Sequence, residues 1–395
     1  MLFLRDSVHL SDETLVVPME LIPVLRKLDG LHTLEEIHKE IREEDKEEIS
    51  VEIIQEIFYY LDRAHFLDGK DFEDWRIKVE KSYHDSPVRP SYLAGKSYDA
   101  NPVVLRNQID GFFTGADGPG LLPKNDGPGD FPPRGLVAPH IDFHRGGAAF
   151  AWSYSTLIGR AMADVFVILG TVHAPIRGMY SLTQKSFETP LGALEVESDF
   201  VDALDRRVPG DLFEDEFAQR GEHSIEFQAV FLRYLYPAPV PVRLAPVLVG
   251  SFGKFVAEGC SPQGDEEIES FIEALKRTIT NFEAEGRRVC LLASADLAHV
   301  GPQFGDEEPV DEAQLHALEE ADCASLGAAC RGDAEEFYWS VASDGDARKV
   351  CGLAPIYTML RVLEGCRGEV LRYSQWPDPV GTVTFCSMVF ESANA

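Results

Sequence analysis

The chain has 395 residues, 45% of them apolar and 26% charged, which is the balance of a globular protein long enough for two domains. The formal net charge of −31 would repel nucleic-acid phosphates, and no apolar run approaches the roughly 20 residues that cross a bilayer, so we expect neither nucleic acid nor a membrane as partner. The first residues lack the pattern of a signal peptide and the seven cysteines indicate reduced thiols, which together predict a cytoplasmic protein.

Helical periodicity marks the first part of the chain. Apolar residues recur at i, i+3, i+4 and i+7 from Leu21, and Gly30 stands where that helix should end. Thr33 has a glutamate three residues later, the spacing of a capping box, and a third periodic segment begins after Ser50. We therefore expect three short helices in a small domain over residues 1–85.

Two motifs in this region resemble a known small domain. "LDG-x-x-T-x-x-E-I", from Leu28 to Ile37, and the later "YLDRAHFLDG" are similar to the winged-helix domain of the PqqD type, which binds a peptide and presents it to a radical enzyme. The resemblance implies a helical, winged-helix fold and a peptide partner. The alternative is a helical cap that only covers the larger domain.

Residues 86–133 are rich in proline, glycine and aspartate, and we interpret them as a connector held in turns. Within them "NPVVLRNQIDGFF" predicts a short helix.

From residue 134 to residue 395, short apolar runs alternate with longer amphipathic segments. The runs predict strands at residues 135–140, 165–173, 243–250, 288–299 and 382–390. Strands that alternate with helices indicate an α/β domain, with a mostly parallel sheet covered by helices on both faces.

Three of these runs finish in a histidine, namely His140, His173 and His299. In open α/β sheets ligands bind outside the carboxyl ends of the strands, so we expect these side chains to converge on one crevice. Neutral imidazole is a common metal ligand. Each histidine alone could instead be a hydrogen-bonded structural residue.

Other polar residues accompany the three histidines and are candidates for the same crevice. Acidic side chains near a histidine can bind a metal ion or orient the ring, and a basic side chain can attract an anion. Asp296 could also cap the turn that follows it. The candidates are Asp142, His144, Arg145, Glu222, His223, Glu226 and Asp296.

The segments "APHIDFHRGG", "ILGTVHAP", "FETPLGALEV", "GEHSIEFQAVFL", "PVLVG" and "SADLAHVG" together resemble the Memo family, protein B of the AmmeMemoRadiSam system, over residues 134–390. That family is similar to class III extradiol ring-cleavage dioxygenases. The resemblance implies that His140 and His173 bind a metal ion, that His223 is the general acid/base, and that Asp296 and His299 line the pocket. We take Asp296 as a candidate metal ligand and His299 as a second candidate catalytic residue.

The sequence departs from the family at one position. Some Memo proteins have a cysteine ligand in the segment around residues 294–299, and Ala298 stands there in this chain. The third ligand would then be Glu222, Asp296 or His223, because non-haem iron oxygenases use two histidines and a carboxylate.

Two functions follow as alternatives. The first is a metal-dependent oxidoreductase or dioxygenase, with Fe(II) as the expected ion and zinc or copper as substitutes, acting on a small molecule or a peptide. The second is a non-catalytic binding component that works with a radical-SAM enzyme and an AMMECR-type protein.

Overall fold

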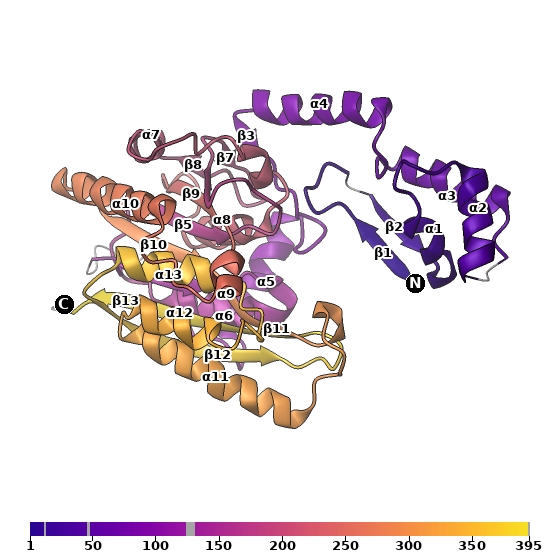
Figure 1. Cartoon of the computed structure of the whole chain (residues 1–395). Helices are drawn as coiled ribbons and strands as arrows, with labels where there is room; N and C mark the ends of the chain where they lie inside the picture. The colour runs from indigo at the N-terminus through magenta and orange to yellow at the C-terminus, as the bar shows by residue number, and fades with distance from the viewer. Residues whose placement is uncertain (12, 46–47, 124–130, 394–395) are drawn as a thin grey trace. The chain divides into compact units, whose positions relative to one another are not determined.

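The computed structural model describes residues 1–11, 13–45, 48–123 and 131–393 (Figure 1). The chain divides into two compact units, Met1–Ser86 and Pro87–Ala395. Among the described residues, no helix combines the length and the apolar character needed to cross a membrane. Part of the predicted connector, residues 124–130, lies outside the described residues.

The first unit begins with two antiparallel strands, β1 (Leu2–Arg5) and β2 (Thr14–Val17). The helices α1 (Ile22–Arg26), α2 (Leu34–Glu40), α3 (Val51–Arg63) and α4 (Lys70–Asp85) follow. The three predicted helices are confirmed as α1, α2 and α3, and the capping box at Thr33 is present. The strand pair and α4 were not predicted. The resemblance to the PqqD type stays a prediction.

The second unit contains a nine-stranded sheet with the order β11-β13-β4-β10-β5-β9-β6, in which β12 also pairs with β13 and β8 with β9. Its four central strands are parallel: β4 (Gly135–Ala138), β10 (Val289–Ser294), β5 (Val165–Thr171) and β9 (Arg243–Val249). The antiparallel strands are β6 (Tyr180–Leu182), β11 (Asp296–Val300), β12 (Cys366–Trp376) and β13 (Thr382–Ser392). The short strand β8 (Glu195–Val196) runs parallel to β9. A separate parallel pair joins β3 (Val88–Arg89) to β7 (Ser186–Phe187).

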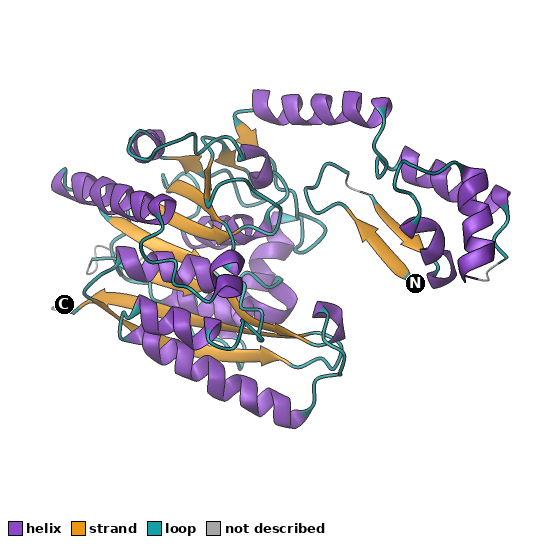
Figure 2. Ribbon diagram, in the orientation of Figure 1, coloured by secondary structure: helices purple, strands orange, loops and turns teal. Residues whose placement is uncertain are grey.

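Helices cover both faces of this sheet, as the sequence predicted (Figure 2). Alternate side chains of β5 enter two different cores, Val167 one and Phe166 the other, because successive residues of a strand point to opposite faces. One core includes side chains of α7 (Ser198–Asp205), α10 (Glu266–Ala284), α11 (Glu312–Cys330), α12 (Ala334–Ala342) and α13 (Leu353–Val362). The other includes side chains of α5 (Pro102–Thr114), α6 (Phe143–Ser155) and α8 (His223–Leu235).

Helix α5 confirms the short helix predicted inside the proline- and glycine-rich segment. Its apolar side chains Leu105, Ile109 and Phe113 are fully buried in the second core, so this stretch packs within the larger unit. The division into residues 1–85, 86–133 and 134–395 stays a prediction about parts that fold independently.

Candidate functional site

Three histidine rings meet at the carboxyl ends of the central strands. His140 lies two residues beyond β4, His173 lies two residues beyond β5, and His223 is the first residue of α8. The ring centroids of His140 and His173 are 5.2 Å apart, those of His140 and His223 are 5.2 Å apart, and those of His173 and His223 are 4.6 Å apart. The structure therefore brings together residues that are up to 83 positions apart in the sequence (223 − 140).

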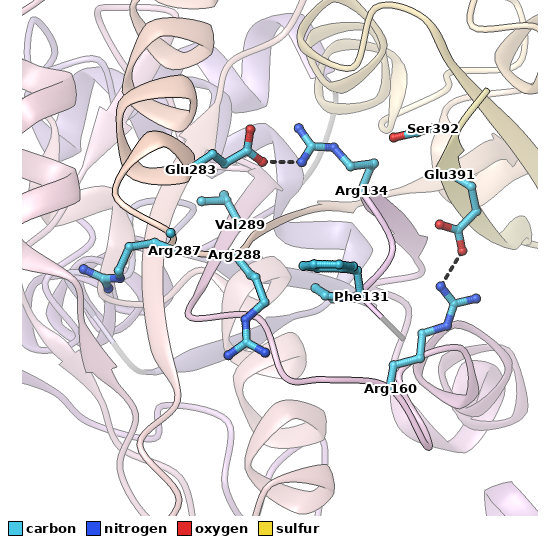
Figure 3. Close-up of a pocket in the computed structure, with 11 residues that line it drawn as sticks. Phe131, Arg134, Arg160, Glu283, Arg287, Arg288, Val289, Glu391 and Ser392 are labelled. Atoms are coloured by element: carbon cyan, nitrogen blue, oxygen red, sulfur yellow. Dashed lines mark hydrogen bonds and ion pairs between the residues drawn. The ribbon is translucent and has the colours of Figure 1, made fainter. Parts of the chain in front are cut away.

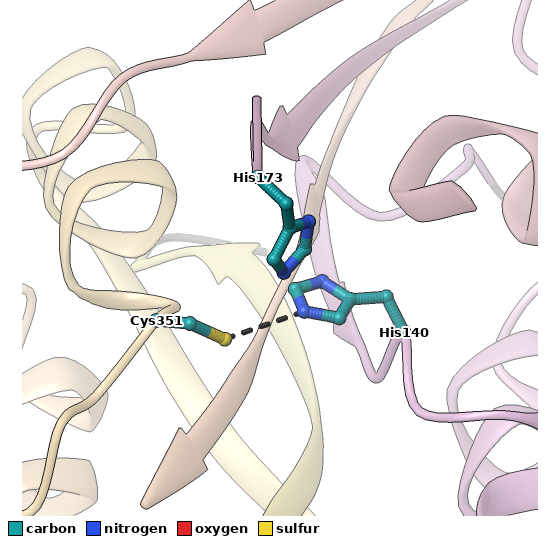
Figure 4. A group of neighbouring side chains, drawn as sticks. All are labelled: His140, His173 and Cys351. Atoms are coloured by element: carbon teal, nitrogen blue, oxygen red, sulfur yellow. Dashed lines mark hydrogen bonds between the residues drawn. The ribbon is translucent and has the colours of Figure 1, made fainter. Parts of the chain in front are cut away.

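A thiol that the sequence analysis did not single out completes the group. Cys351 lies in the loop between α12 and α13, and its Sγ is 3.3 Å from Nε2 of His140 (Figure 4). One donor atom from each of His140, His173 and Cys351 lies within 4.8 Å of the other two. No sequence motif around Cys351 indicates a metal ligand, because the residue comes close to His140 only in the folded protein.

Hydrogen bonds fix the orientation of both imidazole rings. His140 Nδ1 lies 3.0 Å from the carbonyl oxygen of Ser294, and a carbonyl can only accept, so Nδ1 carries the proton. His173 Nδ1 lies 3.1 Å from both carboxylate oxygens of Glu222. In each ring Nδ1 is thus engaged and Nε2 is the nitrogen left for a metal ion, the arrangement that metal-binding histidines commonly have; at His173 the ion would displace a proton.

Glu222 is a buried carboxylate that supports two histidines. Its oxygens accept the backbone N–H groups of His173 and Ser224, at 2.8 and 3.0 Å, and lie 3.1 Å from Nδ1 of His223. Burial alone would raise its pKa, but the charges of His173 and His223 hold the pKa of Glu222 well below its usual range. With its oxygens engaged in this way, Glu222 orients the rings.

Burial sets the protonation of the donors. It lowers the pKa of His140 well below the ordinary value, so this imidazole is neutral. Burial would also lower the pKa of His173, but the adjacent Glu222 carboxylate raises it well above the ordinary value. Burial raises the pKa of the Cys351 thiol, so a nearby cation is needed to hold it as a thiolate.

The donor set fits a transition-metal ion. In a tetrahedral site with ordinary metal–nitrogen and metal–sulfur lengths, the two donors lie about 3.5 Å apart. The 3.3 Å between His140 Nε2 and Cys351 Sγ is close to that value. Two imidazoles and one thiolate suit iron, copper or zinc, and three protein ligands leave a position open for another molecule.

Asp296, predicted as a metal ligand, lies beside this group but outside it. Its Oδ1 accepts the backbone N–H of His140 at 2.9 Å, and its Oδ2 is 3.7 Å from His140 Nε2. Burial raises the pKa of Asp296 to about 7. The carboxyl group therefore accepts a backbone N–H, but that N–H belongs to His140 and not to the turn that follows Asp296.

Two further predicted residues occupy the surrounding wall. His299, on β11, packs edge-on against Phe304, and its Nδ1 lies 3.0 Å from the carbonyl oxygen of Leu297. Burial lowers the pKa of His299 to about 4. His144 packs edge-on against the ring of Trp376. Within the described part of the chain, neither ring makes a hydrogen bond or a ring contact with the donors described above.

Three further residues considered in the sequence form contacts within their own surroundings: Arg145, Asp142 and Ala298. Arg145 Nε bonds Asp142 at 2.6 Å, and Asp142 caps the first turn of α6. Ala298 is buried, and its N–H donates to Thr384.

Glu226, predicted to line the pocket, instead belongs to a buried ion pair. Its carboxylate is 2.6 Å from Nη1 of Arg89, and it also accepts the hydroxyl of Tyr98 at 2.5 Å and the N–H of Leu93 at 2.9 Å. The guanidinium of Arg89 donates in turn to the carbonyl of Glu222, at 2.7 Å. The pair therefore anchors the start of α8, because a buried carboxylate needs such partners.

Two cavities in the larger unit differ in position. A cavity of about 340 Å³ is lined by His173 and Cys351. A larger one, of about 880 Å³, is lined by Arg134 and Val289, at the amino ends of β4 and β10 (Figure 3). Its arginines pair with carboxylates, such as Arg160 with Glu391 at 2.6 Å. The larger cavity therefore lies at the sheet edge opposite to the histidines.

Comparisons with known proteins agree over most of the chain. The family described as Memo-like protein matches residues 89–384. A MEMO1 family protein of Aquifex aeolicus is 26% identical over 98% of this chain and 95% of its own, so its similarity includes the first unit. A MEMO1 family protein of Methanopyrus kandleri is 28% identical over 76% of this chain and 98% of its own. A solved structure of an uncharacterized Escherichia coli K12 protein aligns with 65% of this chain and 98% of that chain, at 14% identity and a TM-score of 0.33.

Proposed function

The chain belongs to the Memo family of Memo-like proteins, and from that premise we propose that it is a metal-dependent oxidoreductase whose ion is held by His140, His173 and Cys351. The observation that carries the proposal is the 3.3 Å approach of the Cys351 thiol to Nε2 of His140. The other nitrogen of the His140 ring, Nδ1, already forms a hydrogen bond with the carbonyl oxygen of Ser294. The cysteine supplies the third donor that Ala298 lacks, and it does so from a different segment of the chain.

Fe(II) is the ion we propose, with copper or zinc as the alternatives that elemental analysis would distinguish. When bound, ferrous iron would supply one-electron chemistry and Lewis acidity next to an open position. His140 and His173 would hold it as neutral imidazoles, and Cys351 as a thiolate. Glu222 keeps the His173 ring turned toward the donors through its hydrogen bond at Nδ1.

His223 is the residue that we propose as the proton carrier. Its Nδ1 lies 3.1 Å from Glu222, so the carboxylate fixes the ring and Nε2 is the atom left to exchange a proton with substrate. The ring stacks on His173, with 4.6 Å between centroids, yet its side chain is 32% exposed and so remains accessible. A base oriented by a third group is the usual arrangement for proton transfer.

The test compares His223→Gln with the wild-type protein, each loaded anaerobically with iron. Oxygen uptake is measured with ascorbate as electron donor, and metal content is measured on the same samples. We expect the variant to lose oxygen uptake and keep its iron, because it lacks a proton acceptor and keeps every ligand. His316→Gln, at an exposed position on α11, is the matched control and should behave as wild type.

Three results would contradict this account. Loss of iron from His223→Gln would make His223 a ligand. Unchanged oxygen uptake with unchanged iron would remove its role as proton carrier. Absence of uptake in the wild-type protein would favour the binding function.

That second function has one observation in its favour, within the first unit. A cavity of about 340 Å³ lies between β2 and α3, lined by Leu15, Val17, Ile53 and Ile57. Among the described strands, β2 pairs only with β1, so its other edge can accept an extended peptide. We propose that this groove binds a segment of a radical-SAM enzyme or an AMMECR-type protein.

Co-purification of the full chain with each candidate partner tests the groove. Ile53→Glu should abolish the complex, because the side chain lines the cavity and a buried carboxylate would lack a partner. A complex that survives this substitution would contradict the proposed groove.

A further inference from the structure

The cavity beside His173 and Cys351 has the size of a small-molecule site. Its walls come from the ends of β5 and β9, from the start of α9 (Gly253–Glu258), and from the loop that carries Cys351. Its volume of about 340 Å³ is at the lower end of the range for ligand pockets. A compact substrate could therefore reach the proposed metal ligands from this side.

The lining of this cavity combines apolar side chains with a lysine. Phe252, Val256, Leu353 and Ala354 supply apolar surface, and Lys349 is the only lysine or arginine among the lining residues. A chain with a net charge of −31 repels anions in general, so one lysine at a cavity wall is a specific point of attraction.

An acidic residue, Asp346, lines the same cavity, but its carboxylate is already engaged. Its Oδ1 accepts the backbone N–H of Val350 at 2.9 Å. Burial also raises the pKa of Asp346. The acid therefore shapes the loop that carries the lysine.

The present partner of Lys349 is Asp306, at 2.5 Å between Nζ and Oδ1. The two side chains are 39% and 36% exposed, and ion pairs at that exposure contribute little. A substrate oxyanion that enters the cavity can therefore replace Asp306 on the ammonium group.

The loop that carries Lys349 has an unusual backbone. Asp346 and Lys349 have φ values of 55° and 53°, in the left-handed region that favours glycine. Strain of this kind persists only where neighbours enforce it, and it is concentrated at functional sites. Here Arg348 enforces it, because its guanidinium bonds the buried Asp322 at 2.5 Å and its carbonyl accepts the N–H of His299 at 2.7 Å.

From these contacts we propose that Lys349 binds an anionic group of the substrate, which is a small carboxylate or similar oxyanion with an apolar body. The apolar walls hold the body, and Cys351, two residues from the lysine on the same cavity, places it beside the metal ligands. The inference rests on the proposed function, because it names the substrate class of that site.

The test is calorimetric binding of 3-phenylpropanoate and of its neutral amide to the full chain at constant ionic strength. We expect the wild-type protein to bind the carboxylate about tenfold or more tightly than the amide, since charged hydrogen bonds are the stronger ones. Lys349→Met should remove that preference. Lys254→Met, an exposed lysine on α9, is the matched control and should retain it.

Asp306→Asn provides an independent variant in case Lys349→Met fails to fold. It frees the lysine while an amide oxygen can still accept the N–H of Gly301, which Asp306 now binds at 2.7 Å. We expect tighter binding of the carboxylate and unchanged binding of the amide. Equal binding of the two probes by wild type, or a preference that survives Lys349→Met, would overturn the proposal. Because these readings need no turnover, they are separate from metal content and oxygen uptake, which test the proposed function.

Discussion

At the scale of single residues, Glu222 links the proposed metal ligand to the proposed proton carrier. The same carboxylate oxygen, Oε1, lies 3.1 Å from Nδ1 of His173 and 3.1 Å from Nδ1 of His223. A change in charge on either ring is therefore felt by the other through one buried group, since electrostatic interactions are strong away from water.

His299 gives a prediction about pH. Its pKa is lowered by burial to about 4, from an ordinary value of 6.5. Below about pH 6.5 the unfolded chain takes up a proton that the folded chain binds only near pH 4, so stability present above pH 6.5 is lost across that interval. We expect the wild-type free energy of unfolding to fall by up to about 3 kcal/mol more than that of His299→Gln. Urea denaturation at pH 7 and pH 4.5 measures this, and parallel pH profiles for the two proteins would refute it.

The sequence indicated His140, His173 and His223 because each stands at the end of a strand or the start of a helix, where the topology of a parallel sheet is informative. It did not indicate Cys351, which lies 211 positions from His140 in a loop without a motif. It also placed Glu226 in the pocket, since spacing alone does not reveal that Arg89 bonds this carboxylate in the interior.

At the scale of elements, the turn into α13 positions the thiol. Gly352 follows Cys351 directly, and its N–H donates to the carbonyl of Asp296 at 3.0 Å. A β-carbon at Gly352 would lie 2.4 Å from that oxygen and 2.7 Å from the β-carbon of Ala295. The Asp296 oxygen is a backbone atom and the Ala295 β-carbon is attached directly to the backbone, so neither can move aside easily. Only glycine therefore allows the loop to come this close to residues 295 and 296.

Gly352→Ala should therefore displace the loop. We expect a loss of about 1–3 kcal/mol in the free energy of unfolding, typical of overpacking, together with reduced metal content. Gly111→Ala in α5 is the matched control, because nothing lies within 4 Å of its added carbon. The control should be neutral or slightly more stable, as alanine favours helix. Denaturation curves and metal analysis of both variants measure these effects. A Gly352→Ala protein as stable as wild type would contradict this account of the loop.

The four central parallel strands of the large sheet could be predicted because buried parallel strands are continuous apolar runs. The run 288–299 was predicted as one strand but is divided into β10 and β11, and β6, β8 and β12 were not predicted. The pair β1 and β2 could not be predicted, since both strands are short and partly exposed and their apolar residues show no long alternation. The structure of the segment 86–133 was difficult to predict for another reason. Its proline and glycine content indicates turns, while the buried face of α5 becomes evident only against the core that receives it.

At the scale of the whole molecule, each unit has its own hydrophobic core. Val24, Ile37 and Ile54 belong to a cluster confined to the first unit, and the clusters around the sheet lie entirely in the second. A unit with its own core can fold alone. The proposed site residues all lie in the second unit, so we expect metal binding to be independent of the first.

A fragment of residues 87–395 should consequently fold and bind metal as the full chain does. We expect one cooperative unfolding transition and the same number of ions per chain. Calorimetry and metal analysis of the fragment beside the full chain provide the measurement. An insoluble fragment, or one without a cooperative transition, would show that the larger unit depends on the smaller.

The metal content of anaerobically purified protein tests the central claim most directly, with wild type, Cys351→Ala and Cys323→Ala prepared side by side. Cys323 is an exposed cysteine on α11 and serves as the matched control. If His140, His173 and Cys351 hold one ion, wild type and Cys323→Ala will each contain about one iron per chain and Cys351→Ala will lose it, because two imidazoles alone are an incomplete ligand set. Retention of a full equivalent of metal by Cys351→Ala would contradict the proposed site.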